Sequence, residues 1–298
     1  MQKQSLTLVL LVLGCFGGFG TGCQETTAAA PLRLAGFKNP ESVLYDRTRD
    51  VYWVSNMGEG APIARDGDGY ISRLTPDGAL DARYISSDRP DTTLNAPKGM
   101  AVLGQELFVA DIDCVRVFDA DTGRPLREIS FPDAEFLNDL ALSPDGTLYV
   151  SETGMDASLQ PTGKDAIYRV RNGSAPERWL TGRELGNPNG LTATVEALWV
   201  ATFGTAELLQ IGYDGTTLAR HSAPQGGLDG IEPTADGGFL VTSWEAKAVY
   251  HVTPTGEFRI ERGALESPAD LGFDSTRERL LVPLMSLNQV LIEPIQPK

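Results

Sequence analysis

Residues 227–263 read GLDGIEPTADGGFLVTSWEAKAVYHVTPTGEFRIERG, and this stretch contains the pattern that decides the fold. Four short runs rich in apolar, β-branched and aromatic residues follow one another, at 230–234, 238–243, 248–253 and 257–263. The turns at 235–238 and 254–256 supply the Asp and Gly that tight hairpins need for positive φ angles. The stretch therefore predicts four antiparallel strands joined by hairpins.

The same unit recurs along the chain, and each copy opens with a similar segment. The six openings are NPESVLYD (39–46), APKGMAVL (96–103), FLNDLALS (136–143), NPNGLTAT (187–194), GLDGIEPT (227–234) and SPADLGFD (267–274). One residue of each opening falls in the same register, and we call these the ring residues: Glu41, Lys98, Asn138, Asn189, Asp229 and Ala269. They are 57, 40, 51, 40 and 40 residues apart. A period near 40 with four strands per unit predicts an all-β, six-bladed β-propeller.

The last unit contains only three clear strands, at 270–273, 280–283 and 289–294. A short apolar run at 32–37 precedes the first ring residue and has no partner in the first blade. We expect this N-terminal strand to close the ring as the outer strand of the sixth blade, so that no long sheet edge stays open. The propeller domain then spans residues 32–298.

Two connections, at 57–69 and 153–165, are longer than their counterparts in the other units. Both fall between the second and third strands of a blade. In a propeller this connection emerges on the face where the innermost strand begins. We therefore expect both insertions to overhang the ring residues as a lid or pocket wall, with tolerated surface insertions as the alternative.

The N-terminus has the pattern of an export signal. A single charge at Lys3 is followed by an apolar run at 6–13 that is too short for a permanent membrane span. Residues 20–23 resemble a lipoprotein processing site, which predicts a signal peptide at 1–22, lipidation of Cys23 and a tether at 23–31. Lipidation at Cys15 and plain secretion after residues 28–30 are the alternatives. We expect an exported protein, lipid-anchored in a bacterial cell envelope on its periplasmic side or surface, or secreted.

Composition limits the partners of this domain. The chain of 298 residues has a formal net charge of −15, and no cluster of Lys or Arg interrupts the acidic balance. Binding to nucleic acid, or to a membrane other than through the lipid anchor, is disfavoured. If Cys15 leaves with the signal peptide and Cys23 is lipidated, Cys114 is the remaining cysteine and no internal disulfide forms. We expect a monomer that binds a small molecule.

The ring residues favour a metal site, because innermost strands converge on the propeller axis. Glu41 and Asp229 supply carboxylates, while Asn138 and Asn189 supply amide oxygens. Oxygen ligands of this kind suit one hard divalent cation, calcium first, with magnesium, zinc or manganese as alternatives. Lys98 enters the same ring. It would orient a substrate carbonyl, stabilise an oxyanion, or neutralise the carboxylates in place of a metal.

The chain resembles the regucalcin/gluconolactonase family of six-bladed propellers, which includes senescence marker protein. The resemblance rests on Pro40-Glu41, Asn138-Asp139, the Pro-Asn-Gly-Leu run at 188–191 and Asp229-Gly230. It implies that Glu41, Asn138, Asn189 and Asp229 bind one divalent cation, and that the activity is hydrolysis of a lactone or related ester. Phe136 stands where sugar-lactone members of the family have Arg, which argues against a polyhydroxylated lactone.

These features predict a metal-dependent lactonase or esterase in which the cation polarises the carbonyl. Asp229 or Asp139 would act as general base, with Lys98 as a third catalytic residue. The second strands end at a set of residues expected to form an outer pocket ring, of which Asn56 and Trp244 are the candidate substrate contacts. The set is Asn56, Asp111, Glu152, Phe203, Trp244 and Met285. The alternative function is a non-catalytic envelope propeller that binds a partner protein, peptide or glycan.

Overall fold

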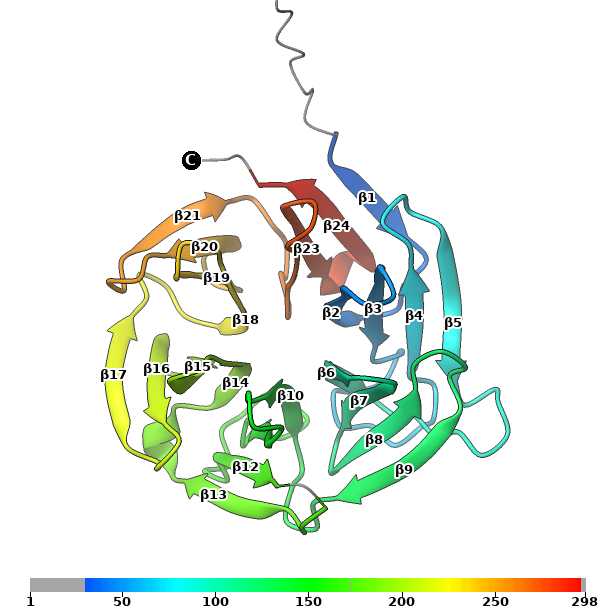
Figure 1. Ribbon diagram of the computed structural model, residues 1–298, viewed down its shortest axis with the longest axis horizontal. Helices are drawn as coiled ribbons and strands as arrows, with labels where there is room; N and C mark the ends of the chain where they lie inside the picture. Colours follow the sequence, from blue (N-terminus) through cyan, green and yellow to red (C-terminus); the bar gives the residue numbers. More distant parts are fainter. Residues whose placement is uncertain (1–29, 172, 296–298) are drawn as a thin grey trace, which may run out of the picture.

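A computed structural model describes residues 30–171 and 173–295, and it confirms the six-bladed β-propeller. Six antiparallel sheets of four strands each surround one axis (Figure 1). In blades one to five the chain runs outward from the axis, strand by strand, through hairpins. Each predicted hairpin unit is therefore one blade.

The strands of the first three blades follow in chain order: β2 (Pro40–Asp46), β3 (Val51–Asn56), β4 (Tyr70–Leu74), β5 (Leu80–Ser86); β6 (Pro97–Leu103), β7 (Glu106–Asp111), β8 (Cys114–Asp119), β9 (Pro125–Ser130); and β10 (Leu137–Leu142), β11 (Leu148–Glu152), β12 (Ala166–Val170), β13 (Glu177–Thr181). Those of the last three are β14 (Pro188–Ala193), β15 (Ala197–Thr202), β16 (Glu207–Gly212), β17 (Thr217–Ser222); β18 (Leu228–Pro233), β19 (Phe239–Ser243), β20 (Ala248–Val252), β21 (Phe258–Arg262); and β22 (Gly272–Asp274), β23 (Arg279–Leu284), β24 (Gln289–Pro294), β1 (Leu32–Ala35). Two single-turn 3-10 helices, η1 (Arg183–Leu185) and η2 (Met285–Leu287), interrupt the loops.

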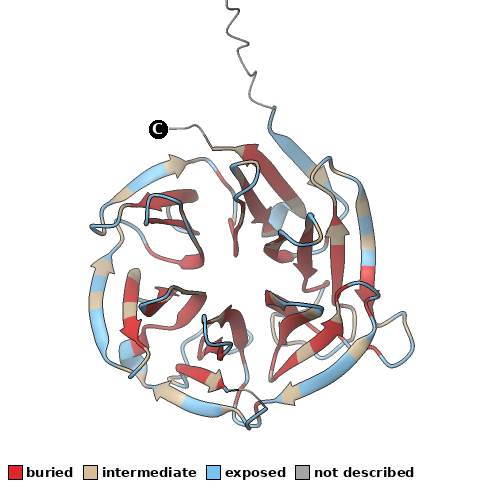
Figure 2. Cartoon of the chain, in the orientation of Figure 1, coloured by how far each residue is buried: buried red, intermediate tan, exposed pale blue. Residues whose placement is uncertain are grey.

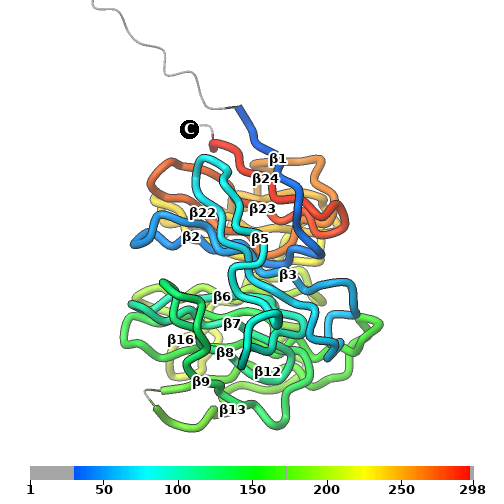
Figure 3. The backbone as a smooth tube through the Cα atoms, turned by 90° about the vertical axis from the view of Figure 1, so that its right-hand side faces the viewer, coloured from blue at the N-terminus to red at the C-terminus, as the bar shows by residue number. Residues whose placement is uncertain are grey.

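The sixth blade is built from both ends of the chain, as predicted. β1 pairs antiparallel with β24, with Leu32 opposite Ile292 and Ala35 opposite Gln289. Figure 3, turned by 90° from Figure 1, shows the two strands together at one end of the molecule. The N-terminal strand therefore closes the ring and covers the edge of β24 that would otherwise be unpaired.

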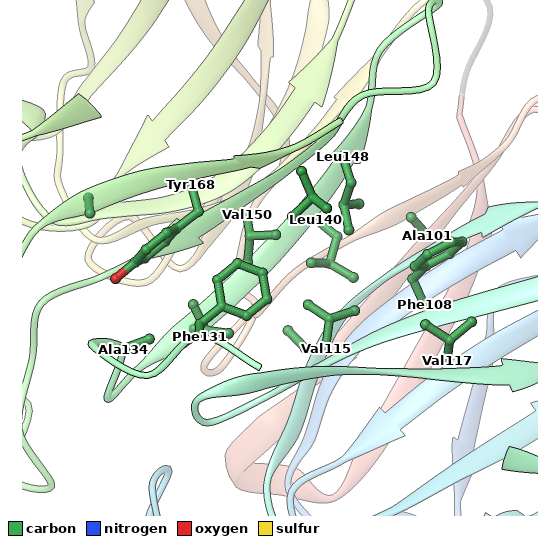
Figure 4. Packing of buried hydrophobic residues seen from close by; sticks show 14 residues of the cluster. Ala101, Phe108, Val115, Val117, Phe131, Ala134, Leu140, Leu148, Val150 and Tyr168 are labelled. Atoms are coloured by element: carbon green, nitrogen blue, oxygen red, sulfur yellow. The ribbon is translucent and has the colours of Figure 1, made fainter. Parts of the chain in front are cut away.

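Six clusters of the hydrophobic core each lie between two neighbouring blades. Figure 4 shows the one between blades two and three, where Phe108 and Val117 face Leu140 and Val150. The inner strands of each blade are buried, whereas outermost strands such as β9 and β17 consist of exposed and half-buried residues (Figure 2). Each blade is therefore stabilised by apolar packing on both of its faces.

The predicted signal peptide at 1–22, the lipidation site Cys23 and nearly all of the tether at 23–31 lie outside the described residues. Among the residues that the structure does describe, no helix is long and apolar enough to cross a membrane. Cys114 is buried in β8 as a free thiol.

Deletion of residues 31–37 tests the closure. It removes β1 and leaves the edge of β24 unpaired, together with one side of the cluster between blades six and one, which contains Phe37. We expect loss of cooperative unfolding, or a melting temperature lower by ten degrees or more, measured by circular dichroism. Deletion of 24–30 is the control and should change the melting temperature little; equal losses for the two deletions would contradict the closure.

Candidate metal-binding and active site

The ring residues owe their position to a repeated irregularity in the innermost strands. In blades one to five the first residue of the innermost strand pairs with the end of the second strand, and the register then shifts. A bulge of this kind turns one side chain out of the ladder. That residue is Glu41, Lys98, Asn138, Asn189 or Asp229 in turn, and each is at most 5% exposed.

Glycines follow three of the ring residues and let the strands approach the axis closely. At Gly190 a Cβ atom would lie 2.1 Å from the backbone oxygen of Asp229 in the next blade. A side chain at this position would push blades four and five apart.

The five polar ring residues line one cavity, which holds about 460 Å³ of empty space including its part open to solvent. The cavity wall also contains residues from both insertions and from the ends of second strands. Its other members are Met57, Pro62, Phe136, Thr153, Met155, Leu159, Phe203, Trp244 and Met285. The prediction that the insertions at 57–69 and 153–165 overhang the ring is confirmed.

Three of the four predicted metal ligands have a buried oxygen with no hydrogen-bond partner in the protein. These atoms are Glu41 Oε2, Asn189 Oδ1 and Asp229 Oδ1, which come from three different blades. Buried polar atoms are normally paired, because an unpaired one loses its hydration without compensation. Three such oxygens around one cavity fit an electropositive ligand.

The fourth predicted ligand, Asn138, is oriented by Thr153. The Thr153 hydroxyl donates its one proton to the carbonyl oxygen of Pro188 at 2.9 Å. The hydroxyl oxygen can therefore only accept from the Asn138 amide, whose Nδ2 lies 3.0 Å away. This fixes the amide so that its nitrogen is used by Thr153 and its oxygen is left for the cavity.

Trp244 fixes Asp229 in a similar way. Its indole Nε1–H donates to Asp229 Oδ2 at 2.7 Å, which leaves Oδ1 unpartnered. The ring of Trp244 packs edge-on against Phe203, with centroids 6.0 Å apart. Trp244 lies in the cavity wall as predicted, and its contact with a substrate stays a prediction.

The site carries excess negative charge. Burial raises the pKa of Glu41 well above its usual range, and the nearby carboxylates of Asp229 and Asp270 raise it further. The pKa of Asp229 is raised by burial and by Asp270, although the Trp244 hydrogen bond opposes the shift. Buried carboxylates of this kind are stabilised in their charged form by a bound cation.

Lys98 lies in the ring, but its ammonium faces backbone oxygens. Its Nζ donates to the carbonyl oxygens of Pro62 at 2.8 Å and Ala96 at 3.0 Å, and it lies 4.9 Å from the centre of the Phe136 ring. In the described part of the chain no salt bridge joins Lys98 to a ring carboxylate. Burial lowers the pKa of Lys98, and the charge of Glu41 opposes this shift. The geometry does not support Lys98 as a replacement for the metal.

Asn56 lies outside the cavity. Its amide nitrogen donates to the Val54 carbonyl at 3.0 Å and to the Ser72 hydroxyl at 3.1 Å, and its oxygen accepts from the Lys38 N–H. Asp111 and Glu152 also accept backbone N–H groups of the segment that enters the innermost strand. The geometry does not support the prediction that Asn56 contacts a substrate.

Asp139 lies just behind the ring and outside the cavity wall. Its Oδ1 accepts from the N–H of Leu140 at 2.7 Å, and its Oδ2 accepts from the N–H of Leu191 at 2.6 Å. The carboxylate therefore joins blades three and four, and the geometry does not support Asp139 as a general base. Asp270 follows ring residue Ala269 as Asp139 follows Asn138, and it was not singled out from the sequence. Its carboxylate accepts from the Ser42 hydroxyl at 2.5 Å.

The residues present fit a hard cation through mixed donors. Within 30–171 and 173–295, no three His, Cys, Asp or Glu side chains meet closely enough to hold a metal by themselves. The ring instead offers two carboxylates and two amides, and amide oxygens are ordinary ligands for calcium. The main evidence for this fit is that oxygens of Glu41, Asn189 and Asp229 are buried without a hydrogen-bond partner.

Comparison with known families agrees with this arrangement. Residues 39–270 match the model of the SMP-30/gluconolactonase/LRE-like region, which covers all of the ring. The chain belongs to this family. Membership supports a lactonase-type hydrolase acting on a small-molecule lactone.

Solved structures related to this SMP-30/gluconolactonase-like chain share its fold at low sequence identity. A gluconolactonase from Xanthomonas campestris is 19% identical over 89% of each chain, with a TM-score of 0.66. A luciferin-regenerating enzyme is 11% identical over 89% of this chain and 95% of its own, with a TM-score of 0.66. An inactive variant of virginiamycin B lyase from Staphylococcus aureus is 16% identical over 90% and 99%, with a TM-score of 0.61. No curated protein sequence matches the chain.

Thr153 offers a test of how this family member orients its ligands. In Thr153→Val the acceptor for the Asn138 amide is lost, so the amide is free to rotate. We expect calcium affinity, measured by isothermal titration calorimetry, to fall about tenfold, which corresponds to the loss of one well-oriented ligand contact. Thr153→Ser keeps the hydroxyl and should bind like the wild type.

Thr202→Val is the matched control. Thr202 is also fully buried at the end of a second strand, but its hydroxyl bonds to Glu207 in its own blade. This variant should lose stability without losing calcium affinity. Equal affinities for Thr153→Val and Thr202→Val would contradict the orienting role of Thr153.

A second prediction concerns pH. Burial raises the pKa of Asp270 to about 7. An unfolded Asp titrates near pH 4, so between about pH 4 and 7 the folded protein holds a proton that the unfolded chain has released. The free energy of unfolding in EDTA should therefore fall as the pH rises from 5 to 8, measured by urea denaturation. Asp270→Asn should make the fall shallower; an increase in stability over this range would contradict the prediction.

Proposed function

We propose that this protein is a divalent-metal-dependent hydrolase of a lactone or related ester. The observation that carries the proposal is the set of three unpartnered buried oxygens, on Glu41, Asn189 and Asp229, which surround one cavity together with Asn138. Family membership supports the class of reaction. The cation we propose is calcium, because the donors are carboxylate and amide oxygens.

Glu41, Asn138, Asn189 and Asp229 would hold the cation. Bound there, it would supply Lewis-acid polarisation of a carbonyl and a lowered pKa for an adjacent water. The chain itself orients the ligands, through Thr153 on Asn138 and Trp244 on Asp229. Residues of both insertions also form part of the wall around the ring.

Asp229 is the candidate general base, because its Oδ1 faces the cavity without a protein partner. Burial and the charge of Asp270 raise the pKa of Asp229 in the metal-free protein, and a cation bound beside it would lower that pKa. Lys98 is the candidate oxyanion group. Two of its three N–H donors are used by backbone carbonyls, which leaves one for a substrate oxygen.

A purely structural or partner-binding propeller would leave these features without a cause. Burying two carboxylates without a counter-charge costs stability, and an ion pair with Lys98 would be the simplest remedy. The Lys98 ammonium instead contacts backbone oxygens of Pro62 and Ala96. The ring thus keeps its negative charge available for a cation.

Glu41→Gln tests the proposal. The substitution keeps the size of the side chain and removes one negative charge from the ring. We expect calcium to raise the melting temperature of the wild type by several degrees, and to have little effect on Glu41→Gln. Lactone hydrolysis, followed by release of acid in a weakly buffered indicator assay, should fall at least a hundredfold in the variant.

Asp274→Asn is the control for removal of a buried carboxylate. Asp274 is fully buried in blade six and bonds to Tyr52 and Arg277, outside the cavity wall. This variant should be less stable but should keep the calcium response. A wild-type preparation that contains no metal, and whose melting temperature does not respond to calcium, would refute the proposal.

A further inference from the structure

We infer that the ligand of this cavity is an uncharged, mainly apolar lactone or ester, and that a polyhydroxylated sugar lactone is rejected. The inference rests on the proposed function in one respect: it takes the carbonyl group of the ligand to lie at the cation. It concerns the rest of the ligand, which must lie against the cavity wall above the ring. The wall residues and their hydrogen bonds carry the argument.

The upper wall is built from apolar side chains of several blades. Phe136, Phe203 and Trp244 present aromatic surface, and Met57, Met155 and Met285 present flexible thioethers. Met57 and Met285 also belong to one buried apolar cluster. Methionine adapts its shape to apolar surfaces, and aromatic rings gain most from contact with apolar or planar groups.

The few polar side chains outside the four cation ligands are already partnered. The Thr153 hydroxyl donates to the Pro188 carbonyl and accepts from Asn138. The Trp244 N–H donates to Asp229, and Lys98 uses two of its three donors on backbone carbonyls. Outside the four cation ligands, a sugar ring in this cavity would therefore find one free side-chain donor, on Lys98, for its hydroxyl groups.

This shortage sets the selectivity. A hydroxyl group that leaves water and finds no partner loses roughly tenfold in binding, whereas each buried methylene gains roughly two- to fourfold. A lactone with an alkyl arm is favoured on both counts. The third N–H of Lys98 is consistent with one ester oxygen near the ring.

Leu159 provides an independent observation. It lies in the insertion at 153–165, lines the cavity and is 41% exposed. Its φ angle is +56°, in the left-handed region where Gly and Asn are favoured and Leu is costly. The turn is held by Asp156, which accepts the N–H groups of Ser158 and Gln160. An exposed leucine in an unfavourable backbone conformation at the rim of the cavity indicates selection for apolar contact rather than for stability.

The experiment compares δ-valerolactone, δ-nonalactone, δ-dodecalactone and glucono-δ-lactone with the calcium-loaded protein. We expect kcat/KM to rise with alkyl length and to be at least a hundredfold lower for glucono-δ-lactone than for δ-nonalactone. A preference for glucono-δ-lactone would overturn the inference and leave the proposed function standing. Hydrolysis of none of the four would count against the proposed function.

If none of the four lactones is hydrolysed, the inference is tested by the binding of the matching lactams, which the protein does not hydrolyse. Titration calorimetry should show tighter binding of δ-lactams with longer alkyl arms, and no measurable binding of glucono-δ-lactam at millimolar concentration. Equal or tighter binding of the sugar lactam would overturn the inference whether or not the protein is a catalyst.

Leu159→Asn provides the side-chain test. Asn suits the left-handed conformation, so the fold should be as stable as the wild type or slightly more so, while the gain in kcat/KM or lactam affinity with alkyl length should shrink severalfold. Leu218→Asn is the matched control on outer strand β17, where the leucine is 55% exposed and outside the cavity wall. An unchanged chain-length dependence in Leu159→Asn would contradict the placement of the alkyl arm against this loop.

Discussion

Each blade of this protein buries both of its faces against neighbouring blades, so no blade is stable unless the ring closes. The six interblade clusters supply the apolar packing. The pairing of β1 with β24 completes the sheet of the last blade, which packs against the first. The same constraint determines the centre of the molecule. Five innermost strands, each with a bulge at its start, bring Glu41, Lys98, Asn138, Asn189 and Asp229 to one cavity from five blades.

Convergence on an axis has an electrostatic cost. Carboxylates that would repel one another little if they were exposed and far apart are buried near one another, and their pKa values rise as a result. The Asn138 amide donates to the Thr153 hydroxyl, and Trp244 donates to Asp229 Oδ2, so that Asp229 Oδ1 is left without a protein partner. The arrangement is unfavourable for an isolated protein and favourable for one that binds a cation, which is how functional sites commonly depart from rules that hold elsewhere in a fold.

The fold was predictable because its signals are local and repeated. The Asp-Gly turns, the period of the opening segments and the spare strand at 32–37 each predict an element that the structure contains. The cavity was predictable only in part. Asn56 and Trp244 are not equivalent in the structure: Asn56 and Ser243 each pair with the first residue of their innermost strand, while Trp244 lies one residue further along, in the place of Met57. Asn56 is used by backbone N–H and C=O groups of its own blade, while Trp244 reaches the ring. The difference is one residue of register, and the sequence pattern alone does not show at which residue the strand pairing ends. The hydrogen bond of Asp139 could not be read from the sequence either, since its backbone partner Leu191 belongs to the next blade.

The pairing of Leu32 with Ile292 also determines the order in which this molecule can form. The first strand to be synthesised finds its partner only in the last, and contacts so distant in sequence make folding slow. Until β24 exists, the edge of β1 stays unpaired and the faces of blades one and five that pack on blade six stay uncovered. The chain therefore has no complete native state at any intermediate length. The residues of β24 complete the core as well as the last sheet.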